Sequence, residues 1–116
     1  MRTAINLAAA ALEMGDAETS EAMARLAFEH GQRSDSHDRA ESIVAERLIH
    51  QARLLRGDES AGPDLKSVIQ RDWSDDLGGL ESLQAVYEWA QRHGDGETQR
   101  WAGGRIERVA HDYSSS

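Results

Sequence analysis

Three short stretches of similar sequence decide how this chain folds: GDAET at residues 15–19, GDES at 57–60 and GDGET at 94–98. Each separates two segments that are rich in Ala, Leu, Glu, Gln and Arg, all of which favour helices. Glycine ends a helix in a left-handed backbone conformation, and the aspartate carboxylate can cap the next helix within one or two residues. We therefore predict that each stretch folds one helix back alongside the next.

The segments between these stretches repeat their apolar residues at intervals of three and four, which is typical of helices with one buried face. Residues that favour strands are sparse, and the single proline is Pro63. We predict an all-α protein of five or six helices packed as antiparallel helix hairpins, the last helix being weakened by Gly103 and Gly104. The expected helices cover residues 3–14, 17–30, 38–56, 63–72, 80–93 and 97–111.

The length of the chain, 116 residues, is enough for one hydrophobic core. We expect a single all-helical domain over residues 1–113, followed by a disordered tail over 114–116. Cysteine is absent, which excludes disulfides and thiolate chemistry. The apolar stretch at 4–12 is short, is interrupted by Asn6 and lacks a small-residue cleavage site, so we interpret it as an amphipathic helix and expect a cytoplasmic protein without a membrane span.

The charge balance is acidic. Asp and Glu total 21 against 13 Lys and Arg, which gives a formal net charge of −8 at pH 7. A chain of this charge repels a polyanion at long range, so nucleic acid is a disfavoured partner.

Within residues 1–34, apolar and small residues fall at a recognisable set of positions around the Gly15-Asp16 turn: Leu7, Ala8, Ala10, Ser20, Ala27 and Phe28-Glu29. This arrangement resembles a tetratricopeptide repeat, in which two antiparallel helices form one unit of a stack. The chain departs from that family where Ala4 and Ala11 replace large aromatic residues and Gln32 replaces the terminal proline. The resemblance implies a scaffold that recognises another protein. An irregular helical bundle is the alternative fold.

The first functional hypothesis is therefore a protein interaction module or a small homo-oligomer. The faces that carry His50, Tyr87 and Trp89 are the candidate binding surfaces. Trp89 lies off the apolar stripe of its helix, so we expect its ring to be exposed, and an exposed tryptophan favours a binding surface. The sequence contains no nucleophile elbow, phosphate-binding glycine loop or dinucleotide fingerprint. No catalytic residue or cofactor is assigned, and enzymatic activity stays open.

A metal-dependent helical-bundle enzyme is the second hypothesis. His37 with Glu41, and Glu46 with His50, are each one helical turn apart, a spacing that can supply two ligands from one helix. A di-iron bundle would need Glu-x-x-His pairs on two helices, and the sequence contains none. The simpler interpretation is a solvent-facing ion pair at each place, without a metal.

A regulator that contacts nucleic acid is the third hypothesis. Arg100, Trp101, Arg105 and Arg108 combine cations with an aromatic ring, as single-strand binding surfaces do. Nearby acidic residues dilute this charge. The simpler interpretation is that Trp101 belongs to the core and that the arginines lie outside it.

Overall fold

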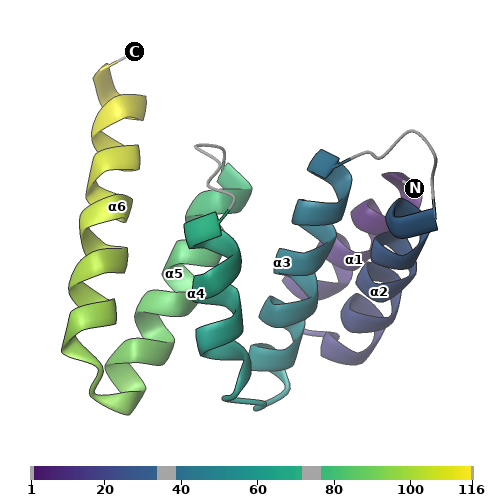
Figure 1. Ribbon diagram of the computed structural model, residues 1–116, viewed down its shortest axis with the longest axis horizontal. Coiled ribbons are helices and arrows are strands. Elements are labelled where there is room, and N and C mark those ends of the chain that lie inside the picture. The colour runs from purple at the N-terminus through teal and green to yellow at the C-terminus, as the bar shows by residue number, and fades with distance from the viewer. Residues whose placement is uncertain (1, 34–38, 72–76, 116) are drawn as a thin grey trace. The chain divides into compact units, whose positions relative to one another are not determined.

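The structure is a computed structural model that describes residues 2–33, 39–71 and 77–115. In this part of the chain it contains helices and no strand, which confirms the predicted all-α class (Figure 1). The six helices, in chain order, are α1 (Arg2–Glu13), α2 (Ala17–Arg33), α3 (Arg39–Leu55), α4 (Ala61–Arg71), α5 (Leu77–His93) and α6 (Gly96–Ser115).

The helix ends differ from the expected ones at a few places. Helix α4 begins at Ala61, so Pro63 is its third residue and still lies in the first turn, where its missing N–H group is tolerated. Helix α6 passes through Gly103 and Gly104 without a break. It continues to Ser115, past the point at which the sequence suggests the start of a disordered tail.

The three glycine-aspartate corners have the predicted left-handed glycine. The φ angles are 80° at Gly15, 94° at Gly57 and 68° at Gly94. At each corner the N–H of the following aspartate donates to the carbonyl five residues earlier, and the glycine N–H donates to the carbonyl three residues earlier. This pair of bonds is the Schellman pattern, which satisfies carbonyls that the end of a helix leaves open.

The aspartates then cap the first turn after each corner. The backbone N–H of Thr19 donates to Asp16 Oδ1 at 3.1 Å, and the backbone N–H of Thr98 donates to Asp95 Oδ1 at 3.1 Å. The second corner is one residue shorter, and there Ser60 donates both its N–H and its hydroxyl to Asp58 Oδ1. The capping role predicted for these aspartates is therefore confirmed at Asp16 and Asp95. Hydrogen bonds from the side chains of Thr19 and Thr98, and next from their backbone N–H groups, lower the pKa of the Asp16 and Asp95 carboxyls.

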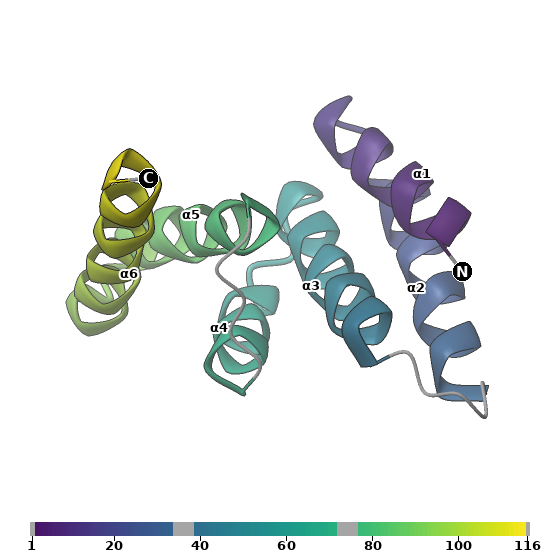
Figure 2. The same ribbon diagram turned by 90° about the horizontal axis from the view of Figure 1, so that it is seen from above.

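The chain forms two compact units, residues Met1–Ala61 and Gly62–Ser116. The first contains α1, α2 and α3, which lie side by side in both views (Figures 1 and 2). Helix α2 turns a face of small residues to its neighbours, and Ser20 Oγ donates to the Ala8 carbonyl at 2.7 Å. Gly31 lies so close to Ser42 of α3 that a Cβ atom would overlap the serine hydroxyl. Small residues on these faces let the helices pack closely.

The second unit contains α5 and α6 and nearly all of α4. Its buried side chains include Leu65, Val68, Ile69, Leu83 and Val86. Lys66 of α4 donates from Nζ to Thr98 Oγ1 at 2.7 Å, and Thr98 in turn donates to Asp95 Oδ2 at 2.7 Å. This chain of hydrogen bonds ties α4 to the beginning of α6. The expected single domain over 1–113 stays a prediction.

The substitution Gly62→Ala tests the packing of the second unit. Gly62 is buried, and an added Cβ atom would overlap the Trp89 ring, so the ring has to move. We expect Gly62→Ala to lower the free energy of unfolding by about 1–3 kcal/mol, the usual cost of overpacking a core. Urea denaturation followed by circular dichroism measures this difference.

Gly104→Ala is the matched control. Gly104 is exposed inside α6, and an added Cβ atom there meets nothing within 4 Å. Alanine in a helix is favoured over glycine, so this variant should be more stable than the parent by about 0.5–1 kcal/mol. Equal effects of the two substitutions would contradict the packing of Trp89 on Gly62.

Candidate functional site

A groove of about 500 Å³ lies between α5 and α6. Tyr87 is the one residue in it that the sequence singled out as a candidate binding residue. The groove runs along matching faces of the two helices, because its lining residues follow helical spacing on each of them. The lining consists of Gln84, Tyr87, Glu88 and Gln91 from α5 and Gly103, Ile106 and Glu107 from α6.

A glycine of α6 lines the groove opposite Tyr87. Gly103 carries no side chain, and the ring of Tyr87 lies opposite it, so that an added Cβ atom would be 3.3 Å from Tyr87 Cε2. The Tyr87 hydroxyl accepts a hydrogen bond from Gln99 Nε2 at 3.3 Å, which fixes the ring from α6. The sequence marked Gly103 only as a weak point of the last helix. Its closeness to Tyr87 depends on how α5 and α6 pack, which the sequence does not show.

The chemistry of the groove combines an apolar floor with acidic edges. Tyr87 and Ile106 are half-buried, whereas Glu88 and Glu107 are exposed. Exposed amide groups of Gln84 and Gln91 add hydrogen-bond donors and acceptors, and the lining residues include no Lys or Arg. Such a surface can take an apolar side chain next to a cationic one.

Trp89 has a packing role. Its ring is half-buried rather than exposed as expected, because it lies against Gly62 of α4. It also stacks on the ring of His93, with centroids 4.8 Å apart and planes 27° apart. Trp89 and Tyr87 are two positions apart and therefore point about 160° away from each other on α5. The structure does not bring them together in one site.

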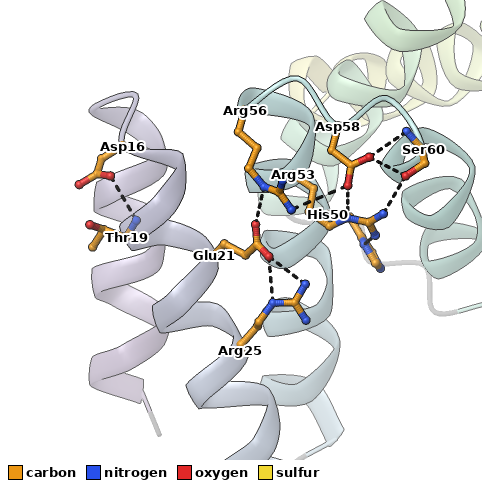
Figure 3. Close-up of polar contacts among 9 residues, drawn as sticks. All are labelled: Asp16, Thr19, Glu21, Arg25, His50, Arg53, Arg56, Asp58 and Ser60. Carbon is orange, nitrogen blue, oxygen red and sulfur yellow. Dashed lines mark hydrogen bonds and ion pairs between the residues drawn. The ribbon is translucent and has the colours of Figure 1, made fainter.

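His50 belongs to a different cluster, at the corner after α3 (Figure 3). Arg53 lies at its centre. The Arg53 guanidinium reaches His50 Nδ1 at 3.0 Å, donates from Nε to Asp58 Oδ2 at 2.9 Å and donates from Nη2 to Ser60 Oγ at 3.1 Å. These contacts bind the end of α3 to the corner after it. His50 thus contributes to the local structure of the first unit.

The Asp58 carboxyl is the group most strongly affected by this cluster. Hydrogen bonds from the Ser60 hydroxyl and from Arg53 favour its ionised form and lower its pKa from 3.8 to about 2. Burial opposes this lowering of the pKa, and the positive charge of Arg53 adds to the lowering by a smaller amount.

A second concavity of about 510 Å³ lies on the first unit, lined by Glu18, Glu21, Ala22, Arg25 and Arg56. Glu21 lies between the two arginines (Figure 3): Arg25 Nε donates to its Oε2 at 2.9 Å and Arg56 Nε to its Oε1 at 2.8 Å. Burial raises the pKa of the Glu21 carboxyl, but the hydrogen bonds from Arg56 and Arg25 outweigh it and lower the pKa. The local charges are balanced, and Arg56 links the corner after α3 to α2.

The hypothesis of a metal-dependent enzyme requires a cluster of metal-binding side chains. Among the residues that the structure describes, no group of three or more His, Asp or Glu side chains could hold a metal ion. Glu41, Glu46 and His50 all make other interactions, and His37 lies outside the described residues. Glu41 and Glu46 are five positions apart on α3, so they point about 140° away from each other.

Trp101, from the third hypothesis, is surrounded by cations. Its half-buried ring has Lys66 Nζ at 5.7 Å and the Arg105 guanidinium carbon at 5.3 Å from the centroid. The Lys66 contact connects α4 with α6 inside the second unit, and the Arg105 contact lies within α6. Arg100 and Arg108 are exposed. Binding of nucleic acid by this surface stays a prediction.

Comparison with known proteins gives no family, because no family model, curated protein or solved structure matches this chain. Within residues 2–33, 39–71 and 77–115, no helix has both the length and the apolar character that crossing a membrane requires. The class that the structure defines is an all-α protein with glycine-aspartate corners.

The lowered pKa of Asp58 predicts a pH dependence of stability. Because the folded-state pKa is below the ordinary value, the ionised carboxylate adds stability that is fully present above pH 3.8 and is lost as the pH falls through about 2. Asp58→Asn should therefore lower the urea midpoint at pH 5, and its difference from the parent should shrink as the pH approaches 2. The measurement is a series of urea titrations between pH 2 and pH 5.

The control for this series is Asp112→Asn, which replaces an exposed carboxylate near the end of α6. It should leave the midpoint nearly unchanged at every pH. A deficit of Asp58→Asn that stays constant down to pH 2 would show that the carboxylate charge does not contribute.

Proposed function

We propose that this protein is an interaction module that holds a basic segment of another protein in the groove between α5 and α6. The observation that carries the proposal is the composition of that groove: an apolar floor at Tyr87 and Ile106 between acidic edges at Glu88 and Glu107, with no Lys or Arg among its lining residues. A segment with Lys or Arg next to an apolar residue would match both properties.

The charge of the whole chain supports the same partner. A formal net charge of −8 attracts a cationic segment at long range and raises its rate of encounter. The carboxylates of Glu88 and Glu107 then favour a cationic segment in the groove, because they repel an acidic one at the same place. The exposed amides of Gln84 and Gln91 can bond to the backbone of an extended segment, whatever its sequence.

The resemblance of residues 1–34 to a tetratricopeptide repeat also favours protein recognition. The three corners at Gly15, Gly57 and Gly94 share their hydrogen-bond pattern, which is consistent with a helix pair that recurs along the chain. Stacked helix pairs commonly present extended binding surfaces. We propose a tetratricopeptide-like helical repeat on this ground.

A peptide-selection experiment tests the proposed function. Phage-displayed random peptides are selected on the protein at low salt, and selected sequences are then titrated by fluorescence polarisation. We expect enrichment of Lys or Arg next to an apolar residue. The substitutions Glu88→Lys and Glu107→Lys should each weaken binding about tenfold, because an attraction becomes a repulsion. Glu97→Lys, an equal charge change on α6 outside the groove lining, should weaken it far less.

Two adjacent glycines supply the steric control. Gly103→Gln places a side chain against Tyr87 inside the groove and should abolish binding, whereas Gly104→Gln points into open space and should preserve it. Circular dichroism verifies that both variants stay helical. Selection of acidic peptides, or equal binding by the two glutamine variants, would overturn the proposal.

A further inference from the structure

The two carboxylates of the groove between α5 and α6 stand on different helices. Glu88 follows Tyr87 on α5, and Glu107 follows Ile106 on α6. Neighbouring residues of a helix are turned by about 100°, so each exposed carboxylate points away from the half-buried residue before it. The apolar floor of Tyr87 and Ile106 therefore lies between two acidic edges.

The two acids are also offset along the groove. Gly103 of α6 lies opposite Tyr87 of α5, which aligns the two helices on either side of the corner at Gly94. Glu88 is one residue nearer to that corner than Tyr87, whereas Glu107 is four residues farther from it than Gly103. Because a helix rises about 1.5 Å per residue, the two acids differ by roughly 7 Å along the groove.

Two acids placed in this way need two cations. The axes of packed helices are about 8–10 Å apart, and the offset along the groove separates the acids further. One guanidinium or ammonium group is too small to contact both. A segment that satisfies Glu88 and Glu107 therefore carries two cations, with an apolar side chain between them that covers Tyr87 and Ile106.

Three successive residues in the polyproline II conformation match this arrangement. This conformation has three residues per turn and rises about 3.1 Å per residue, so successive side chains point about 120° apart. When the middle side chain points to the floor, its neighbours point to opposite edges and are about 6 Å apart along the axis. A β-strand would send both neighbours to the same side.

The handedness of the groove agrees with this conformation. On both helices the right-handed turn runs from the buried residues through Tyr87 or Ile106 to the exposed glutamate. Viewed from the corner with the buried residues below, α5 is therefore on the left and α6 on the right. Glu88, which is nearer, is on the left and Glu107 is on the right, which is the sense of a left-handed helix. Polyproline II of L-residues is left-handed, whichever end of the segment comes first.

We propose that the groove recognises a basic-apolar-basic tripeptide in the polyproline II conformation, with one cation at Glu88 and the other at Glu107. This inference rests on the proposed function and adds the order and the conformation of the bound residues. Polyproline II has no internal hydrogen bonds, so the backbone of the segment can bond to the groove. The Tyr87 hydroxyl accepts a hydrogen bond from Gln99 and can still donate its own proton to a backbone carbonyl.

Three peptides of equal composition test the order of the side chains: Gly-Arg-Leu-Arg-Gly, Gly-Arg-Arg-Leu-Gly and Gly-Leu-Arg-Arg-Gly. NMR titration of the isotope-labelled protein at low salt measures their dissociation constants. We expect the first peptide to bind about threefold more tightly, because in the other two one cation loses its carboxylate. Equal dissociation constants would overturn the inference, while the basic partner of the proposed function stands. If none of the three binds, the proposed function fails as well.

The mirror-image peptide tests the conformation. Gly-Arg-Leu-Arg-Gly built from D-residues has the same charge and composition, but its polyproline II helix is right-handed. It presents its cations to the wrong edges and should bind about as weakly as the two rearranged peptides. Equal binding of the two mirror images would contradict the inference.

Removal of the two acids tests whether each has a cation of its own. Glu88→Gln and Glu107→Gln should each weaken binding of Gly-Arg-Leu-Arg-Gly about threefold, and the double variant about tenfold, because separate contacts add. Glu97→Gln removes an acid of α6 outside the groove lining and should leave binding nearly unchanged. Circular dichroism verifies that the variants fold. A double variant that binds no more weakly than either single variant would mean one shared cation and refute the inference.

Discussion

The fold depends on a backbone constraint, the left-handed glycine that ends one helix immediately before an aspartate. At Gly15, Gly57 and Gly94 the positive φ angle lets two N–H groups return to carbonyls of the preceding helix. An L-residue with a side chain adopts this conformation only at a cost of about 1–2 kcal/mol. The next residue then accepts hydrogen bonds from the following turn, with the result that the pKa is lowered at all three aspartates. Each glycine-aspartate stretch thus provides hydrogen-bond donors for the last carbonyls of one helix and fixes the turn that follows it.

The first unit is packed through small buried residues that let its helices approach closely, with larger apolar side chains around them. Its buried residues are mostly alanines, and α2 contributes Ser20, Ala24, Ala27 and Gly31 as its buried face. Ala4 and Ala11 of α1 are among these buried alanines. Ile5 and Leu12 of α1 pack against this core, whereas Leu7 and Met14, the residue that follows the helix, are exposed.

Features that repeat along a single helix could be predicted from the sequence, whereas contacts between two helices could not. Helical periodicity located the six helices to within a few residues, and the glycine-aspartate stretches predicted the capping by Asp16 and Asp95. Contacts between distant residues carry no such signal. Arg56 reaches Glu21 across 35 positions and Lys66 reaches Thr98 across 32. For the same reason helical periodicity places Trp89 on the surface, although Gly62 makes room for its ring.

Gly103 illustrates how a residue that weakens a helix can still serve its packing against a neighbouring helix. A glycine inside a helix costs about 0.5–1 kcal/mol relative to alanine, so Gly103 and Gly104 are both unfavourable on helix propensity alone. Only Gly103 lies against another side chain, 3.3 Å from Tyr87 for an added Cβ atom, while Gly104 meets nothing within 4 Å. The cost at Gly103 is offset by letting α5 and α6 approach at Tyr87 and by leaving open space beside it. Nothing in the structure explains Gly104. Both glycines weaken α6 equally by helix propensity, so only the contact with Tyr87 distinguishes Gly103.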